Sequence, residues 1–269
     1  MSEDGTSIEK TASYWNSVDN MPSELVGVFP MGRCGIVEVF YRHFFEVRHV
    51  KQQVRFHKEM HVLELGCGTG RWALSLSPLV KSYVGVDFSR SSLATAERNV
   101  SRAGLDNVQF HCRSITTFTE SRPLDVIFFS GVTQYLQDDE ISAILDNLSP
   151  CMQDSTILID RSTVNYKKRE NFQQQDYFAI FRTPAEIQNL FASHAFQLRY
   201  SQRSYRFLRG RSILQARRYR KMIIRAVQLT RPVSYFALLF LSFIADVIHP
   251  IPFEGGDRSH DFFIFDRVQ

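Results

Sequence analysis

The sequence predicts an α/β protein built on a doubly wound, mostly parallel sheet, and three observations support that prediction. Short apolar runs alternate with stretches of helical periodicity along most of the chain. One apolar run leads directly into a glycine-rich turn followed by a helix, which is typical of a ligand-binding turn. The 269 residues are 44% hydrophobic and 13% aromatic, which is ample for a large core. Strands that alternate with helices imply parallel strands joined by crossover helices.

The elements of this core follow one another in order. The apolar runs predict strands at 61–65, 82–87, 107–111, 124–130 and 155–160, with helices at 71–80, 90–103 and 138–149. Thr183-Pro184-Ala185-Glu186 is a capping box with proline at the first helical position, so a helix begins there and continues to about His194. Residues 196–200 and 261–266 are predicted as the sixth and seventh strands.

The pattern divides the chain into four parts. Residues 1–58 are predicted as an N-terminal helical cap, 59–202 as a Rossmann-like cofactor-binding core, 203–257 as a basic and apolar helical insert, and 258–269 as the last strand of the core. The four cysteines lack metal-ligand spacing, so we expect no metal site and no disulfide framework. The acidic, polar first residues are no signal sequence, so we expect a cytoplasmic protein.

The turn at 66–70 predicts a nucleoside-type cofactor. The stretch 62–70 reads VLELGCGTG, and its glycines allow a sharp turn and the close approach of a ligand to the backbone. The start of the following helix offers unpaired N–H groups to an anion. Asp87 closes the second strand about 20 residues on, where a carboxylate binds a ribose diol. Arg71 stands where the dinucleotide fingerprint has its third glycine, which argues against a nicotinamide oxidoreductase.

The runs VLELGCGTGRWALSL, YVGVDFSRSSLATAERN and LDVIFFSGVTQYL resemble, in this order and spacing, the class I methyltransferases that use S-adenosylmethionine. The resemblance covers about residues 60–200. It implies a seven-stranded sheet with the last two strands side by side as an antiparallel edge. It also implies S-adenosylmethionine as the cofactor and S-adenosylhomocysteine as the product, and it says little about the substrate.

Carried over position by position, the resemblance implies a set of cofactor contacts. Glu64 precedes the turn and faces the methionine ammonium, while the backbone of 66–68 approaches the methionine part. Asp87 takes both ribose hydroxyls, and Phe88 packs against the adenine. The full implied cofactor-binding set is Glu64, Gly66, Cys67, Gly68, Gly70, Asp87, Phe88, Ser114, Ile115, Ser130 and Tyr14.

Two positions of that set depart from a simple match. Where the family has an aspartate that accepts a hydrogen bond from the adenine amino group, this chain has Ser114 followed by Ile115. A neutral hydroxyl is a weaker acceptor than a carboxylate. Similar methyltransferases present an aromatic residue from an N-terminal helical segment over the cofactor mouth, and Tyr14-Trp15 fits that role. Packing of this aromatic pair against the core is the alternative.

The rim after the fourth strand narrows the choice of acceptor. Residues 130–135 read SGVTQY, without the Asn/Asp-Pro-Pro-aromatic motif of adenine-amino and glutamine methyltransferases. The paired glutamates of protein arginine methyltransferases are also absent there. These differences favour a hydroxyl of a small molecule or glycan as the acceptor, with an anionic or lipid-linked one among the candidates.

Methyl transfer from a sulfonium depends on positioning more than on a base. Positioning is worth about 7–11 kcal/mol, whereas a base typically adds about 10²–10⁴-fold. The candidate catalytic residues are Asp160 as a base, Arg161 as a group that steers an anionic acceptor, and Tyr135 as a donor to the acceptor oxygen. A structural ion pair and a packing tyrosine are the alternatives. No histidine occupies an obvious rim position, and His111 is expected in the core.

Two further segments have compositions suited to substrate binding. The predicted loop 164–181 carries basic and aromatic residues after the fifth strand, where related enzymes build acceptor pockets. Between 203 and 231 there are ten Lys or Arg and no acid, in the pattern of a basic amphipathic helix. The apolar run 232–245 that follows is too short to span a bilayer, which takes about 20 residues. A cap helix, an anionic membrane surface bound through 203–252, and a less favoured nucleic-acid surface remain as interpretations.

We therefore expect a cytoplasmic S-adenosylmethionine-dependent methyltransferase, with peripheral membrane association as an option. An RNA- or lipid-directed methyltransferase is the first alternative. The second is a catalytically inactive cofactor-binding partner subunit, for which Ser114 is the sole support. The sequence leaves the oligomeric state open.

Overall fold

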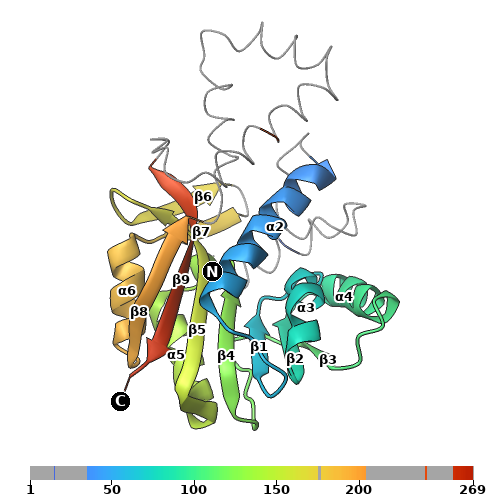
Figure 1. Ribbon diagram of the computed structural model, residues 1–269. Helices are drawn as coiled ribbons and strands as arrows, with labels where there is room; N and C mark the ends of the chain where they lie inside the picture. The colour runs from blue at the N-terminus through green and yellow to red at the C-terminus, as the bar shows by residue number, and fades with distance from the viewer. Residues whose placement is uncertain (1–14, 16–34, 175–176, 204–239, 241–256, 269) are drawn as a thin grey trace, which may run out of the picture.

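A computed structural model of the chain describes residues 15, 35–174, 177–203, 240 and 257–268. It has a seven-stranded sheet with helices on both faces and a separate two-stranded hairpin (Figure 1). In chain order the elements are α2 (Gly35–Gln53), β1 (His61–Leu65), α3 (Arg71–Leu76), β2 (Ser82–Asp87), α4 (Arg90–Arg102), β3 (Val108–Cys112), β4 (Leu124–Ser130), α5 (Asp138–Leu148), β5 (Met152–Asn165), β6 (Glu170–Gln174), β7 (Tyr177–Phe181), α6 (Pro184–Ala192), β8 (Phe196–Arg203) and β9 (Arg258–Arg267). Short 3₁₀ turns follow α3, β4 and α5.

The strand order is β3-β2-β1-β4-β5-β9-β8, which confirms the predicted doubly wound fold. The pairs β1–β2, β2–β3, β1–β4 and β4–β5 are parallel, and β9 is antiparallel to both β5 and β8. The strand β9 therefore lies inside the sheet, and β8 forms its edge. The order reverses between β1 and β4, which is where open α/β sheets bind ligands beyond the carboxyl ends of the strands.

The fifth strand and the segment after it differ from their predictions. The strand β5 continues five residues beyond 160, because the last residues of the ladder pair with the start of β9, down to Asn165 opposite Arg258. The predicted loop 164–181 is wrong, since β6 and β7 pair there as an antiparallel hairpin. The backbone N–H of Asn165 donates to the carbonyl of Arg182 at 2.9 Å, which joins the hairpin to β5.

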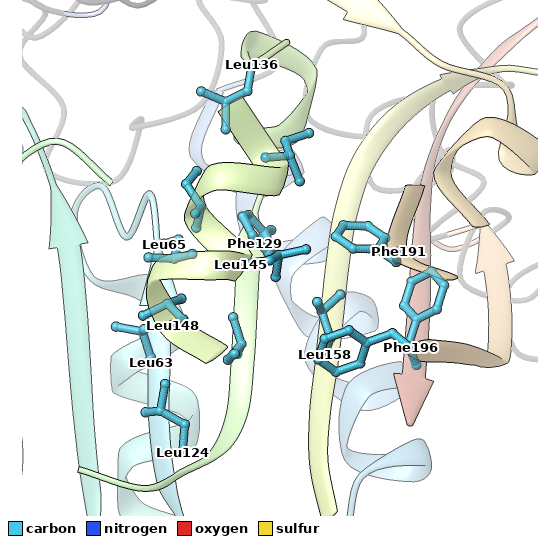
Figure 2. Close-up of a cluster of buried hydrophobic side chains, with 14 of the residues drawn as sticks. Leu63, Leu65, Leu124, Phe129, Leu136, Leu145, Leu148, Leu158, Phe191 and Phe196 are labelled. Carbon is cyan, nitrogen blue, oxygen red and sulfur yellow. The ribbon is translucent and has the colours of Figure 1, made fainter. Parts of the chain in front are cut away.

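The sheet is buried on both faces, which explains why its central strands read as continuous apolar runs. On one face, α5 and α6 cover a cluster of which Figure 2 labels Leu63, Leu65, Leu124, Phe129, Leu136, Leu145, Leu148, Leu158, Phe191 and Phe196. On the other face, α2, α3 and α4 pack around Trp72. The Trp72 ring meets Phe128 edge-on, with centroids 4.7 Å apart, and lies 5.9 Å from Phe262.

The helix α6 begins as its capping box predicts. The Thr183 side chain accepts from the backbone N–H of Glu186, and the Glu186 carboxylate accepts from the N–H of Thr183 at 2.8 Å. Residues 1–14 and 16–34 of the predicted cap at 1–58, including Tyr14, lie outside the described residues, and so does nearly all of the insert at 203–257. Within the part of the chain that the structure describes, no helix is long and apolar enough to cross a membrane.

Candidate functional site

The three glycines of the turn have different physical reasons to be glycine. All have positive φ, at 77° for Gly66, 51° for Gly68 and 75° for Gly70. A Cβ on Gly66 would lie 1.9 Å from Cγ1 of Val132, and one on Gly70 would lie 2.9 Å from Cβ of Ala96. A Cβ on Gly68 would have no atom within 4 Å. Packing therefore requires the outer two glycines, and the middle one opens the backbone to a ligand.

Cys67 turns its side chain into the protein. It is 6% exposed, and a Cβ on Gly85 of β2 would lie 2.9 Å from its sulfur. Burial raises the pKa of this thiol well above its ordinary value, so the thiol stays protonated. At the turn the residue can offer a ligand only its backbone, in keeping with the contact implied for it.

Asp87 lies directly against the turn. Its Oδ2 accepts from the backbone N–H of Gly68 at 2.8 Å, and its Oδ1 accepts from the N–H of Ser89 at 3.0 Å. These two bonds fix the carboxylate at the carboxyl end of β2, beside the open position at Gly68. The next side chain, Phe88, is 37% exposed and can offer an aromatic face to a ligand base.

Glu64 is the most unusual group of the turn region. It is completely buried, and its Oε2 accepts from the hydroxyl of Tyr83 at 2.7 Å. Its Oε1 has no hydrogen-bond partner among the described residues. Burial raises the pKa of this carboxyl to about 8, while hydrogen bonds from Tyr83 and Ser130 oppose the rise. An orphaned buried acceptor fits a ligand that brings a cationic N–H donor.

The predicted adenine contact has a local role as well. The Ser114 hydroxyl lies 2.8 Å from the Thr116 hydroxyl and accepts from the N–H of Thr116 at 3.4 Å. The turn after β3 is therefore held by this serine. Ile115 is half-buried and packs against the cluster beneath α5. Ser130 ends β4 opposite Arg161 and is half-buried.

Asp160 lies in the interior of β5 rather than at its end. It is completely buried, its Oδ1 accepts from the Thr133 hydroxyl at 2.8 Å, and its Oδ2 accepts from the Ser162 hydroxyl at 2.6 Å. Burial raises the pKa of this carboxyl to about 6, against the effect of those two hydrogen bonds. Both oxygens are thus occupied in tying the rim after β4 to β5.

Arg161 points to the opposite face from Asp160, because neighbouring side chains of a strand alternate. The predicted strand 155–160 would put both residues at the strand's end, whereas β5 continues to Asn165 and both lie in its interior, on opposite faces. The Nε of Arg161 donates to Oε1 of Glu46 in α2 at 2.8 Å, and both side chains are buried. Its Nη2 is also buried and has no hydrogen-bond partner among the described residues.

Tyr135 belongs to an aromatic cluster. Its ring packs edge-on against Trp15, at 5.7 Å between centroids, and against Tyr177 of the hairpin at 5.8 Å. The hydroxyls of Tyr135 and Tyr177 are 3.4 Å apart. The geometry therefore agrees with Tyr135 as a packing residue. A role of Tyr135 as hydrogen-bond donor to the acceptor stays a prediction.

Arg182 was not predicted as a residue of the site. It is 2% exposed, and its guanidinium donates to the carbonyls of Thr133 and Leu136, both at 2.7 Å. Its Nε also donates to Oδ1 of Asp138 at 2.7 Å, while Arg169 donates to Oδ2 at 2.8 Å. These contacts fasten the rim after β4 to the hairpin. Although partial burial opposes it, the two arginines lower the pKa of Asp138.

His260 was also missed, and the statement that no histidine lies near the rim is wrong. Its Nδ1 is 2.9 Å from the Thr163 hydroxyl, across the β5–β9 ladder. The backbone N–H of Thr163 donates to Oε1 of Gln134 at 2.9 Å. This bond places the rim after β4 beside the Thr163–His260 pair. The extension of β5 beyond 160, which was not predicted, creates this position together with the start of β9, which falls within the predicted last-strand segment 258–269.

Comparison with known proteins adds the family context. Residues 62–155 match the family model described as a methyltransferase domain. The 23S rRNA (uracil(1939)-C(5))-methyltransferase RlmD of Xanthomonas euvesicatoria is 42% identical over 62 residues, or 23% of this chain and 14% of that protein. The tRNA (uracil-5-)-methyltransferase homolog A of Mus musculus is 31% identical over 107 residues, or 40% of this chain and 16% of that protein. The chain thus spans about a sixth of the length of these curated relatives.

Solved structures resemble a much larger part of the chain. A DhpI–SAH complex has a TM-score of 0.56 and 23% identity, covering 74% of this chain and 91% of that one. Magnesium protoporphyrin IX methyltransferase (ChlM) of Synechocystis, solved with bound SAM, has a TM-score of 0.60 and 12% identity, covering 100% of both chains. At these identities the likeness shows the fold, and the matched domain runs from β1 into β5.

Proposed function

This chain belongs to the class I S-adenosylmethionine-dependent methyltransferases, and we propose that it methylates a hydroxyl of a small-molecule or glycan acceptor. The orphaned Oε1 of Glu64, beside the open glycine turn and Asp87, is the observation that carries this proposal. S-adenosylmethionine, when bound, supplies the methyl group on a positively charged sulfur. Glu64 accepts from the methionine ammonium, Asp87 binds the ribose hydroxyls, and Phe88 packs against the adenine.

The acceptor half of the proposal rests on the side of the sheet beyond β4. The rim at 130–135 lacks the motifs that hold adenine-amino, glutamine and arginine acceptors. Beyond it, the β5–β9 extension carries hydroxyl, imidazole and guanidinium groups at Thr163, His260 and Arg161. These groups suit an acceptor that presents a hydroxyl and a negative charge. Positioning of such an acceptor against the methyl group accounts for most of the catalysis expected.

RNA is the second candidate acceptor. Two curated relatives are named for uracil in rRNA and tRNA, and residues 203–231 carry ten Lys or Arg without an acid. Polycations bind nucleic acid through its phosphates, in a strongly salt-dependent way. No RNA-binding module signature is visible in the sequence, which places RNA second.

One experiment identifies the acceptor. Cell extract, divided into small-molecule, lipid, glycan and RNA fractions, is incubated with the protein and deuteromethyl-labelled S-adenosylmethionine, and products are found by mass spectrometry. The proposal expects a labelled methyl ether in a fraction other than RNA. A labelled product confined to RNA establishes the second candidate. Cofactor binding without a labelled product in any fraction establishes an inactive partner subunit.

Binding of the cofactor is tested separately by calorimetry. Asp87→Ala should lower affinity for S-adenosylmethionine at least about tenfold, because two ribose hydroxyls lose a charged acceptor. The matched control is Asp106→Ala, which removes an exposed acid from the loop before β3. Equal affinity of Asp87→Ala and the wild-type protein contradicts the site assignment.

A further inference from the structure

The β5–β9 ladder carries a row of polar side chains past the end of β4. Ser130, the last residue of β4, lies opposite Arg161, and Thr163 pairs with His260 two residues further along β5. At about 3.3 Å per residue, that pair lies about 7 Å beyond the end of β4. Because directly opposed residues share a face, Arg161, Thr163 and His260 all point to the α2 side of the sheet.

This face is also the one that holds Glu64. Glu64 lies opposite Phe128 on β4, and Ser130 follows Phe128 by two residues, so both point to the same side. The cofactor groups occupy the β1–β2 side of the point where the strand order reverses, and Arg161 and His260 occupy the β5–β9 side. An acceptor bound there would approach the cofactor across the ends of β1 and β4.

His260 is positioned through Thr163, which is itself fixed by a second hydrogen bond. The Thr163 hydroxyl lies 2.9 Å from its Nδ1, and the N–H of Thr163 is held in turn by Oε1 of Gln134 at 2.9 Å. A hydrogen bond at Nδ1 sets the orientation of the ring. Thr163 and His260 are both partly exposed. A side chain of this type, held in place, suits proton removal from an acceptor.

Arg161 supplies a second, independent indication of a ligand. Glu46 occupies its Nε, whereas the buried Nη2 has no hydrogen-bond partner among the described residues. A buried donor left without a partner destabilises the protein, and an incoming anionic group would satisfy it. The planar guanidinium suits a carboxylate or phosphate group.

We propose that Arg161 and His260 form the acceptor subsite, and that the acceptor is a hydroxyl compound bearing a carboxylate or phosphate group. Arg161 binds the anionic group, and His260 takes the hydroxyl proton. The acceptor oxygen forms its bond to the methyl carbon as the carbon–sulfur bond breaks, and the electron pair of that bond stays on sulfur. The imidazolium then releases its proton to water. This inference rests on the proposed function.

The anion half is tested without knowing the acceptor. The full chain, labelled with ¹³C-histidine and saturated with S-adenosylhomocysteine, is titrated with inorganic phosphate while the His260 resonance is followed by NMR. Assignment uses His260→Ala. The wild-type protein should show a saturable shift, which Arg161→Gln should weaken at least about tenfold. Arg122→Gln, at the opposite end of the sheet beside Glu120, is the matched control and should behave as wild type.

Folding of the variants is checked in the same samples. Arg161→Gln removes the cation of a buried ion pair with Glu46, so the double variant Glu46→Gln, Arg161→Gln provides a version in which both charges of the pair are removed. A variant that binds S-adenosylhomocysteine with wild-type affinity is folded, and its phosphate titration can then be compared with that of the wild-type protein. The inference is overturned if phosphate shifts the His260 signal equally in these variants, or does not shift it in the wild-type protein.

The proton-transfer half uses turnover of hydroxy acids and sugar phosphates with labelled cofactor. For any compound methylated, Arg161→Gln should raise KM at least about tenfold with kcat little changed. His260→Ala should lower kcat by about 10²–10⁴-fold, and added imidazole should restore part of it. Normal kcat in His260→Ala, or a loss that imidazole does not restore, overturns this half. Failure of the proposed function looks different, because then no compound of any charge is methylated.

Discussion

Glu64 places a carboxyl group where solvent cannot reach it, and its Oε2 accepts a hydrogen bond from the Tyr83 hydroxyl. Its pKa of about 8 means that the folded protein holds a proton that the unfolded chain, with an ordinary value of 4.5, releases. Between these pH values the folded state binds more protons than the unfolded state. The free energy of unfolding therefore falls as pH rises, by up to about 1.4 kcal/mol per pH unit.

Glu64→Gln should remove that dependence, because an amide stays neutral at every pH. Urea unfolding at pH 5, 6, 7 and 8 should show wild-type stability declining relative to the variant, with the difference between the two levelling off below about pH 4.5. Asp106→Asn, at an exposed position, is the control and should run parallel to wild type. Parallel profiles for Glu64→Gln and wild type would contradict the buried, protonated state.

The same residue predicts a proton released on cofactor binding. An ammonium brought to Oε1 favours the carboxylate and lowers its pKa, so at pH 7 the protein should release close to one proton when it binds S-adenosylmethionine. Calorimetry at pH 7 in phosphate and in Tris should give enthalpies that differ with the ionisation enthalpy of the buffer. The difference should vanish in Glu64→Gln, and a wild-type enthalpy independent of buffer would rule out the exchange.

Gly68 allows the turn's backbone geometry and its binding role to be separated. Gly68→Ala and Gly104→Ala both place a Cβ at positive φ with nothing within 4 Å, at 51° and 65° respectively. Each should cost about 1–2 kcal/mol of stability for the left-handed conformation. Only Gly68→Ala should also weaken S-adenosylmethionine, at least about tenfold, because its methyl group projects where a ligand approaches. Calorimetry and urea unfolding measure the two effects, and equal affinities for the two variants would refute the assignment.

At the scale of elements, the hairpin β6–β7 is held over the rim by Arg182. Its guanidinium satisfies two buried carbonyls and Asp138, and its pKa is lowered by burial against the pull of that carboxylate. Arg182→Gln should destabilise the protein by about 2–4 kcal/mol, since those carbonyls lose their donor. Arg169→Gln, which removes a more exposed partner of Asp138, should cost less than about 1 kcal/mol. Urea unfolding that gives similar losses for both would show that burial does not distinguish them.

Some elements of the fold can be predicted from local sequence pattern, and others cannot. Some elements are encoded by a few neighbouring residues, and the structure has them where predicted. These are the strands β1, β2 and β4, the α6 capping box and the glycine turn. The end of β5 is not encoded in this way, because four of its last five residues, 161–165, are polar and the segment becomes a strand by pairing with the start of β9. The contacts of Arg182 with Asp138 and of Thr163 with His260 join residues far apart in sequence. No local periodicity encodes such pairs.

At the scale of the whole molecule, positive charge is concentrated in one segment. The chain has a formal net charge of +4, while 203–231 contributes +10, so the remainder carries 4 − 10 = −6. The apolar run 232–245 follows directly. Apart from Arg203 and Phe240, the residues of 203–245 lie outside the described ones. A basic stretch beside an apolar one suits binding to an anionic membrane surface. Each Lys or Arg near such a surface contributes about 1 kcal/mol of attraction.

A membrane role for this segment predicts binding that depends on both lipid charge and salt. The full chain should float with liposomes that contain phosphatidylserine and should not float with neutral phosphatidylcholine, and raised salt should release it. Neutralising Arg217, Arg218, Arg220 and Lys221 to Gln should abolish flotation, because the lost attraction is roughly 4 kcal/mol. Neutralising four cations of the folded core, Lys58, Lys81, Arg98 and Arg102, changes net charge equally and should leave flotation intact.

If neither kind of liposome carries the protein, the membrane interpretation fails, and the segment serves as a cap or a substrate surface. If both sets of substitutions release it alike, the attraction follows total charge rather than the segment, since net charge alone sets nonspecific binding.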